Sequence, residues 1–114
     1  MNVQDFLSNL KIPFEVLEHA PTYTAQTLAQ AVHVSGLEVA KTVLLKIDDG
    51  FMLAVLPASY EVDLLRVASF LGATRADVAD EKECEHRFPD CELGVVPPFG
   101  ANYGLRTIVD RSLL

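Results

Sequence analysis

The strongest constraint on the fold is a pair of hydrophobic segments separated by a turn signal. Residues 41–48 read KTVLLKID, residues 51–57 read FMLAVLP, and Asp49-Gly50 lies between them. An Asp-Gly pair between two hydrophobic runs is a strong indication of a tight β-hairpin. Because both segments are almost continuously hydrophobic in their middles, we predict two central antiparallel strands that are covered on both faces.

Helical periodicity appears on both sides of the hairpin, and the predicted helices have recognisable ends. Thr24 is a candidate N-cap of one helix, and Gly72 ends another. Asp80 and Glu83 form a capping-box pattern, in which each residue satisfies a backbone N–H at the start of a helix. The predicted helices cover residues 2–10, 25–34, 62–72 and 81–87. Their core-facing residues are predicted to be Leu28, Ala31 and Val32 in the second helix, and Leu64, Leu65, Ala68 and Leu71 in the third.

Two shorter segments complete the predicted sheet. Residues 14–19, FEVLEH, alternate well enough for an edge strand, and residues 105–110, LRTIVD, form a strand near the C-terminal end of the sequence. We therefore predict an α+β fold, with a mixed and largely antiparallel sheet surrounded by short helices. A chain of 114 residues with 50% hydrophobic residues is large enough for one domain over residues 1–114.

The composition restricts the possible partners and compartment. The net charge of −7 argues against broad binding of nucleic acid, which requires many cations, but allows contact with one RNA end through a local basic site. No hydrophobic run approaches the roughly 20 residues of a membrane span. The N-terminal segment has an acidic residue and no basic region, so we expect no secretory signal and a cytosolic protein.

The cysteines and histidines show no spacing that is typical of a metal or redox site. Cys84 and Cys91 are seven residues apart, and we expect them to be ordinary reduced thiols. His19, His33 and His86 lie far apart, so we expect no metal site. The chain also lacks GxSxG, GxGxxG and P-loop motifs, which makes a covalent mechanism the less favoured one.

One segment concentrates the residues that restrict or free the backbone. Residues 94–104 read GVVPPFGANYG. Gly94 allows a close approach to the backbone, whereas Pro97 and Pro98 stiffen the bend and remove their own N–H groups. A stiff loop of this kind can direct backbone donors at a carbonyl or a phosphate. The alternative interpretation is a structural turn between two elements.

Lys41 is the second candidate functional residue. It opens a hydrophobic strand, directly before Thr42. A lysine at the mouth of a pocket can hold a phosphate or a ribose oxygen as a positive point charge. The alternative is that Lys41 only marks the boundary between the strand and water. Lys46 alternates with hydrophobic residues, and we expect it to be solvent-exposed.

With these segments in order, the chain resembles the YbaK/EbsC family of trans-editing aminoacyl-tRNA deacylases, which are related to the editing domain of bacterial prolyl-tRNA synthetases. The resemblance runs from about Phe14 to Leu114. The matching stretches are EHAPTYTAQTLAQAVHVSG, EVAKTVLLK, FMLAVLPASYEVDLLRVASFLG, and CELGVVPPFG followed by LRTIVDRSLL.

The resemblance implies that water hydrolyses the ester of a wrongly attached amino acid at the tRNA 3′ end, without a metal or an organic cofactor. It implies that Lys41 binds the terminal adenosine or orients the substrate. It also implies that the loop from Gly94 to Pro98 covers the aminoacyl carbonyl, with the Gly94 backbone as an oxyanion donor. The residues implied to contact the substrate are Tyr23, Thr24, Val95, Val96, Pro97, Pro98, Phe99 and Gly100.

The implied partner is the acceptor end of an aminoacyl-tRNA, with an aminoacyl-tRNA synthetase as a second candidate. A small amino acid is the expected substrate, because a synthetase pocket rejects a substrate smaller by one methylene by only about 1–3 kcal/mol. The alternative function is a non-catalytic module that keeps the fold and binds an aminoacyl-adenosine or a protein.

Members of the family usually continue past the strand that corresponds to residues 105–110 into a further segment with pocket residues. The present sequence ends at Leu114. We expect a truncated form, a sheet completed by another chain, or a loss of catalysis. An incomplete sheet exposes an unpaired strand edge, which predicts a homodimer.

Overall fold

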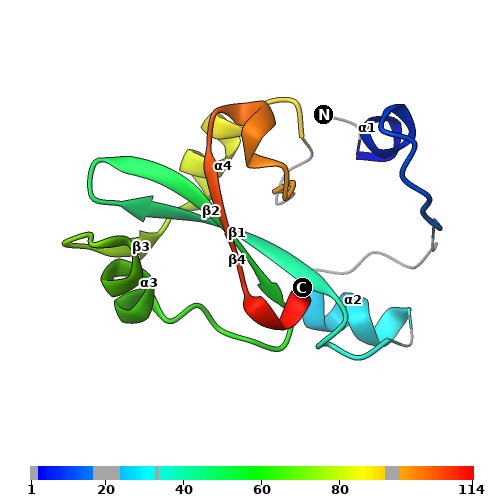
Figure 1. The fold of residues 1–114 in the computed structure, drawn as a ribbon, viewed down its shortest axis with the longest axis horizontal. Coiled ribbons are helices and arrows are strands. Elements are labelled where there is room, and N and C mark those ends of the chain that lie inside the picture. The colour runs from blue at the N-terminus through cyan, green and yellow to red at the C-terminus, as the bar shows by residue number, and fades with distance from the viewer. Residues whose placement is uncertain (1–2, 17–23, 33, 92–95) are drawn as a thin grey trace.

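The computed structural model describes residues 3–16, 24–32, 34–91 and 96–114, and it is built around one mixed sheet. The strand order is β3-β1-β2-β4 (Figure 1). β1 pairs antiparallel with both β2 and β3, whereas β2 and β4 are parallel. The strands are β1 (Ala40–Ile47), β2 (Gly50–Pro57), β3 (Ala76–Val78) and β4 (Arg106–Val109).

Short helices surround this sheet, which confirms the predicted α+β class (Figure 1). The α-helices are α1 (Val3–Asn9), α2 (Ala25–Ala31), α3 (Leu64–Leu71) and α4 (Glu81–Arg87). Two 3₁₀ segments flank β4, namely η1 (Gly100–Tyr103) and η2 (Arg111–Leu113). Among the described residues, no helix has the length and hydrophobicity that a membrane crossing requires.

The central hairpin forms as predicted, but its turn lies one residue earlier. Ile47 pairs with Gly50, so the connecting residues are Asp48 and Asp49, and Gly50 belongs to β2. Asp48 has a φ of 51°, which an aspartate tolerates better than most residues. Its carboxylate also accepts a hydrogen bond from the Arg75 backbone N–H at 2.9 Å. This contact outside the hairpin fixes the turn at Asp48.

Both faces of the hairpin are covered, as its continuous hydrophobicity predicts. On one face, Leu44 and Leu53 are fully buried in a cluster with Phe88. On the other face, Leu45 and Met52 are buried against side chains of α3. Side chains alternate between the faces of a strand, so the two faces of β1 can be assigned residue by residue.

The helix caps also agree with the prediction. The Thr24 hydroxyl accepts a hydrogen bond from the backbone N–H of Thr27 at 3.0 Å and caps α2. Gly72 ends α3 with a φ of 67°, a left-handed conformation that glycine adopts without strain. The capping box of α4 is complete, with hydrogen bonds in both directions between Asp80 and Glu83.

The predicted inward faces of two helices are partly wrong. Helix α2 ends at Ala31, which is exposed, and its buried residue is Ala29. In α3, Leu65 is 85% exposed, whereas Val67 contacts the core. Both helices have eight residues or fewer. In so short a helix, the core-facing side is decided by the sheet it packs on, which helical spacing alone does not reveal.

The minor strands differ from the prediction as well. Residues 14–16 form no strand, and the rest of the predicted edge strand over 14–19 lies outside the described residues. β3 was missed because its three residues carry no recognisable alternation. It forms where the chain is held against β1 by Asp48 and by the pairing of Leu45 with Val78.

Candidate functional site

The described part of the glycine- and proline-rich loop is anchored at several points. Val96 packs against the buried cluster that contains Leu44, and Pro97 is buried. Pro98 is exposed. The Phe99 ring lies against the Phe6 ring of α1, with 4.6 Å between the ring centroids. From Val96 onward, the loop is therefore held by the packing of Val96, Pro97 and Phe99.

Gly100 ends the loop at a position where no side chain fits. A Cβ built on its backbone would lie 2.5 Å from the carbonyl oxygen of Leu105 and closer still to the Thr107 hydroxyl. Gly100 is buried, and its carbonyl accepts a hydrogen bond from the Leu105 N–H at 2.9 Å. The glycine thus allows η1 to lie directly against the start of β4.

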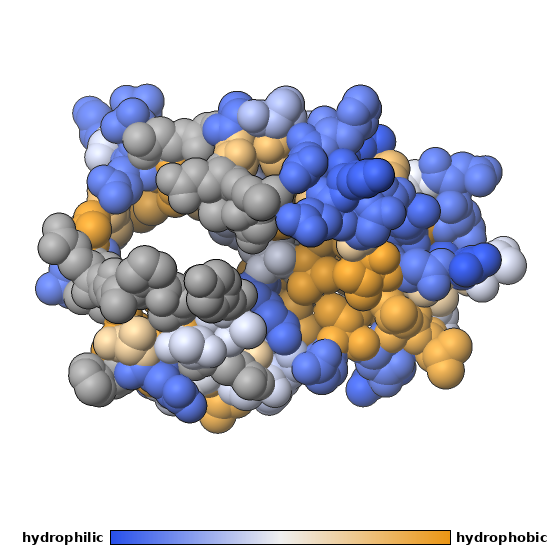
Figure 2. Space-filling model, turned by 180° about the vertical axis from the view of Figure 1, so that it is seen from behind, coloured by the Kyte–Doolittle hydropathy of each residue, from blue (hydrophilic) through white to orange (hydrophobic). Residues whose placement is uncertain are grey.

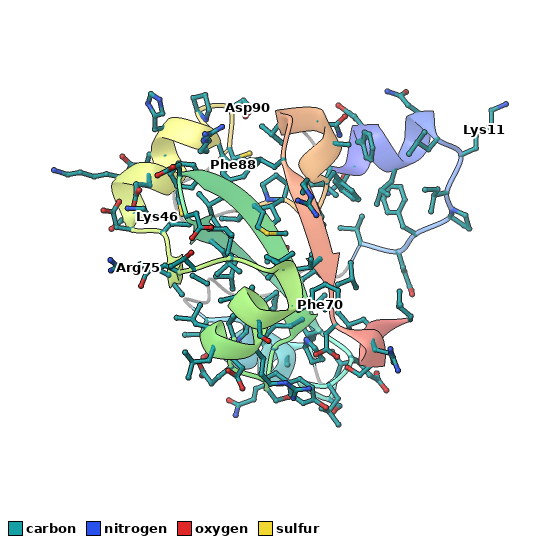
Figure 3. The ribbon with its side chains drawn as sticks, turned by 60° about the vertical axis from the view of Figure 1, so that its left-hand side comes forward. Lys11, Lys46, Phe70, Arg75, Phe88 and Asp90 are labelled. Atoms are coloured by element: carbon teal, nitrogen blue, oxygen red, sulfur yellow. The ribbon has the colours of Figure 1, made fainter. Side chains whose placement is uncertain are left out.

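A cluster that the sequence did not reveal joins the two ends of this loop. The Tyr103 hydroxyl donates to the Asp90 carboxylate at 3.0 Å and lies 3.4 Å from the Cys91 sulfur. The Tyr103 ring packs edge-on against Phe88, with 4.7 Å between centroids. Figure 3 shows Phe88 and Asp90 together beside α4. The only sequence signal was the position of Tyr103 between two glycines.

The half-buried Tyr103 hydroxyl, bonded to Asp90, predicts a pH effect on stability. Burial, then hydrogen bonds to Cys91 and Asp90, raise the pKa of Tyr103 well above its ordinary value. A raised pKa makes the folded state hold the proton, so stability is lost as pH rises above about 10. Tyr103→Phe should make the free energy of unfolding depend less steeply on pH in that range. Denaturant titrations at several alkaline pH values measure this, and an unchanged slope would contradict it.

Lys41 is the second residue of β1. It is half-buried and pairs across the hairpin with Leu56. Alternation along β1 places Lys41 on the α3 face with Leu45, whereas Val96 contacts the opposite face. β3 pairs only with Leu45–Ile47, so no described strand covers the outer edge of β1 beside Lys41. A flexible four-carbon side chain at this edge can extend toward either face.

The expectation that Lys41 and the loop contact the same substrate therefore stays a prediction. Tyr23, Gly94 and Val95 lie outside the described residues. Thr24 has a definite structural role, since its hydroxyl caps α2. The capping role of Thr24 neither supports nor contradicts its predicted contact with a substrate.

A groove of about 490 Å³, which no sequence pattern predicts, lies between α3, β2 and β4. Figure 3 shows Phe70 between α3 and β4, and Phe70 is 79% exposed. Figure 2 shows hydrophobic side chains gathered over α3 and the adjoining part of the sheet. The groove is lined by Ala54, Val55, Leu56, Tyr60, Glu61, Val62, Asp63, Arg66, Val67, Phe70, Ile108, Val109 and Asp110.

Two free thiols and one ion pair involve α4 and the segment that follows it. Cys84 and Cys91 are both free, and burial, aided by the acidic side chains around it, raises the pKa of the Cys84 thiol. A raised pKa disfavours the thiolate, which is the nucleophilic form. Lys46 is exposed, as predicted, and its ammonium group lies 3.0 Å from the Glu83 carboxylate. In the ranges that the structure describes, no three His, Cys, Asp or Glu side chains could together hold a metal ion.

Comparison with known proteins supplies a family for this arrangement. A model of the family "Aminoacyl-tRNA editing domain" matches residues 19–114. The multifunctional Ser/Thr-tRNA deacylase ProXp-y of Escherichia coli K12 is 26% identical over 94% of this chain. A proline–tRNA ligase of Exiguobacterium sibiricum is 30% identical over 98% of this chain. A crystal structure of a candidate trans-editing enzyme for prolyl-tRNA synthetase superposes with a TM-score of 0.79 at 25% identity.

These proteins are longer than the present chain. The matched region spans 66% of the deacylase and 20% of the ligase. The superposed crystal structure is covered to 71%, and it covers 98% of this chain. The similarity thus extends over nearly the whole of this chain but over only part of each relative.

Proposed function

Because the chain belongs to the aminoacyl-tRNA editing domain family, we propose that it hydrolyses the ester of a small amino acid wrongly attached to a tRNA. The match of the family model over residues 19–114 is the observation that carries this proposal. The proposed reaction occurs in trans, on an aminoacyl-tRNA released by a synthetase. An aminoacyl-tRNA synthetase is therefore a second candidate partner.

In the proposed reaction, water attacks the carbonyl carbon of the ester. The bond between this carbon and the ribose oxygen breaks, and the ribose hydroxyl takes up a proton. Backbone N–H groups around Gly94 would hold the negative charge that develops on the carbonyl oxygen. Such donors are most effective when they are fixed in advance. The packing of Pro97, Phe99 and Gly100 supports this role, because it fixes the C-terminal side of the loop.

Lys41 would bind the terminal nucleotide of the tRNA through its positive charge. Its position at an uncovered edge of β1 supports this role, since a phosphate or ribose can approach there. The net charge of −7 is compatible with it, because only the acceptor end of the tRNA has to enter the site. The proposal needs no metal or organic cofactor.

The relative named as a Ser/Thr-tRNA deacylase makes seryl and threonyl esters the first substrates to test. We propose incubating the purified chain with tRNAs that carry labelled serine, threonine, alanine or cysteine, and measuring the release of the amino acid. Correctly charged prolyl-tRNA serves as the control and should stay intact. We expect at least one of these small amino acids to be released faster than proline is released from the control prolyl-tRNA.

Absence of turnover on every substrate, with retained binding of a non-hydrolysable aminoacyl-adenosine analogue, would contradict the proposed activity. This result would instead support the non-catalytic binding module. Calorimetric measurement of the equilibrium binding of the analogue distinguishes this binding module from a protein that does not bind the substrate at all.

A further inference from the structure

The outer side of β4 offers backbone groups that no described strand uses. β4 is an edge strand, and its ladder to β2 continues with a hydrogen bond from the Asp110 N–H to the Val55 carbonyl at 2.8 Å. In a parallel ladder, alternate residues direct their backbone groups toward the partner. Ile108 and Asp110 therefore face β2, and Thr107 and Val109 direct their N–H and C=O groups outward. Free edges of this kind readily pair with a further strand.

We propose that β4 pairs with β4 of a second copy of this chain, antiparallel about a two-fold axis at Ile108. In this register, Thr107 of each copy lies opposite Val109 of the other copy. These are the residues whose backbone groups point outward, so each pair exchanges both of its hydrogen bonds. The sheet then continues from one copy into the next. This inference is independent of the proposed deacylase activity.

Charge complementarity selects this register among the alternatives. Arg106 and Asp110 lie on the same face of β4, on either side of Ile108, so each Arg106 is opposite the Asp110 of the other copy. Arg106 is exposed and forms no ion pair within the described residues. The hydrogen bonds from Ser112 to Asp110 both end on Oδ1, which leaves Oδ2 for a guanidinium. A shift by two residues would place Arg106 opposite Ile108 and remove both ion pairs.

The hydrophobic surface beside β4 also fits a second copy. Ile108 and the exposed Phe70 line the groove next to this edge. Ile108 of the second copy would lie against them and close the open side of the groove. The same lining carries the acidic Glu61 and Asp63 together with the basic Arg66, beside the Asp110 that Arg106 of the second copy would contact. β3, at the other edge, has only three residues, and its Asp77 is already paired with Arg75 at 2.6 Å.

The test is analytical ultracentrifugation of the full chain over a range of concentrations. The buffer should contain about 0.15 M salt, which screens the repulsion between two acidic copies. A concentration-dependent dimer is expected. Arg106→Glu and Asp110→Arg should each raise the dissociation constant of the dimer by about tenfold or more, because each places like charges opposite one another. An equal mixture of the two variants should restore association, since both contacts in the mixed dimer then join opposite charges.

Matched controls separate the ion pairs from general effects of charge and folding. Arg75→Glu changes the charge equally at the β3 edge. Ser112→Ala removes the hydroxyl hydrogen bond to Asp110 but keeps the backbone N–H bond and the Asp110 carboxylate. Both should leave the dissociation constant unchanged. Slow exchange of the Thr107 and Val109 amide hydrogens in the dimer would support the register. A monomer at all concentrations, a dimer unaffected by Arg106→Glu, or a mixture that fails to associate would each overturn the proposal.

Discussion

Lys41→Ala should lower the rate of deacylation at sub-saturating substrate by about 10- to 100-fold, because losing one charge-assisted contact to the terminal nucleotide costs about 1.5–3 kcal/mol. The lysine is half-buried at the start of β1, beside an edge that β3 does not cover. Its removal leaves the pairing of the hairpin backbone intact, so the fold should persist. Single-turnover hydrolysis of the best substrate from the panel of charged tRNAs measures the effect.

Lys46→Ala is the matched control for this experiment. Lys46 lies on the same strand, but it is exposed and paired with Glu83 on the opposite face from Lys41. Its removal should leave the rate unchanged. Lys41→Arg keeps the positive charge and should keep part of the activity. Full activity in Lys41→Ala would show that the lysine only marks the strand boundary.

Gly100→Ala should destabilise the fold by about 2–3 kcal/mol, the cost of forcing a group into a packed site. The new methyl group would meet the Leu105 carbonyl, which belongs to the backbone and cannot rotate away. The segment from Pro97 to Phe99 would have to shift as a result. Denaturant unfolding measures the stability, and hydrolysis at a temperature where the variant is folded measures the effect on the loop.

Gly50→Ala provides the comparison for this substitution. A Cβ at Gly50 would have only an ordinary contact, 3.8 Å from the Ile47 carbonyl oxygen. The change in stability should therefore be small. If Gly100→Ala is as stable as Gly50→Ala, the close packing of η1 on β4 is not a feature of the molecule in solution. Thr107→Ala should not rescue Gly100→Ala, because the contact with Leu105 remains.

Local chemistry explains what could be predicted from the sequence. The caps at Thr24 and Asp80 depend on side chains within three residues of the helix start, so a short window of sequence contains them. The hairpin was predictable for the same reason, with its turn displaced by one residue. The displacement comes from Arg75, which lies far along the chain and holds Asp48 in place.

Long-range contacts explain what could not be predicted. The bond between Tyr103 and Asp90 joins two turns with no shared pattern, and the groove beside Phe70 depends on how α3 lies relative to β4. Alternation along β1 would have assigned Lys41 and Leu44 to opposite faces. The sequence does not reveal which face the proline-rich loop covers, because the path of the chain after α4 decides it.

The parallel pairing of β2 with β4 has a consequence for how the chain acquires its structure. β1 pairs with β2 across a two-residue turn. Val55 of β2, in contrast, pairs with Val109 of β4, which lies about 50 residues later in the chain, and loops of that length close slowly. On the ribosome, the hairpin can therefore assemble while β4 is still being synthesised. During this interval the β4-facing edge of β2, a hydrophobic strand, has unpaired backbone N–H and C=O groups. This edge is where a chaperone would bind the nascent chain.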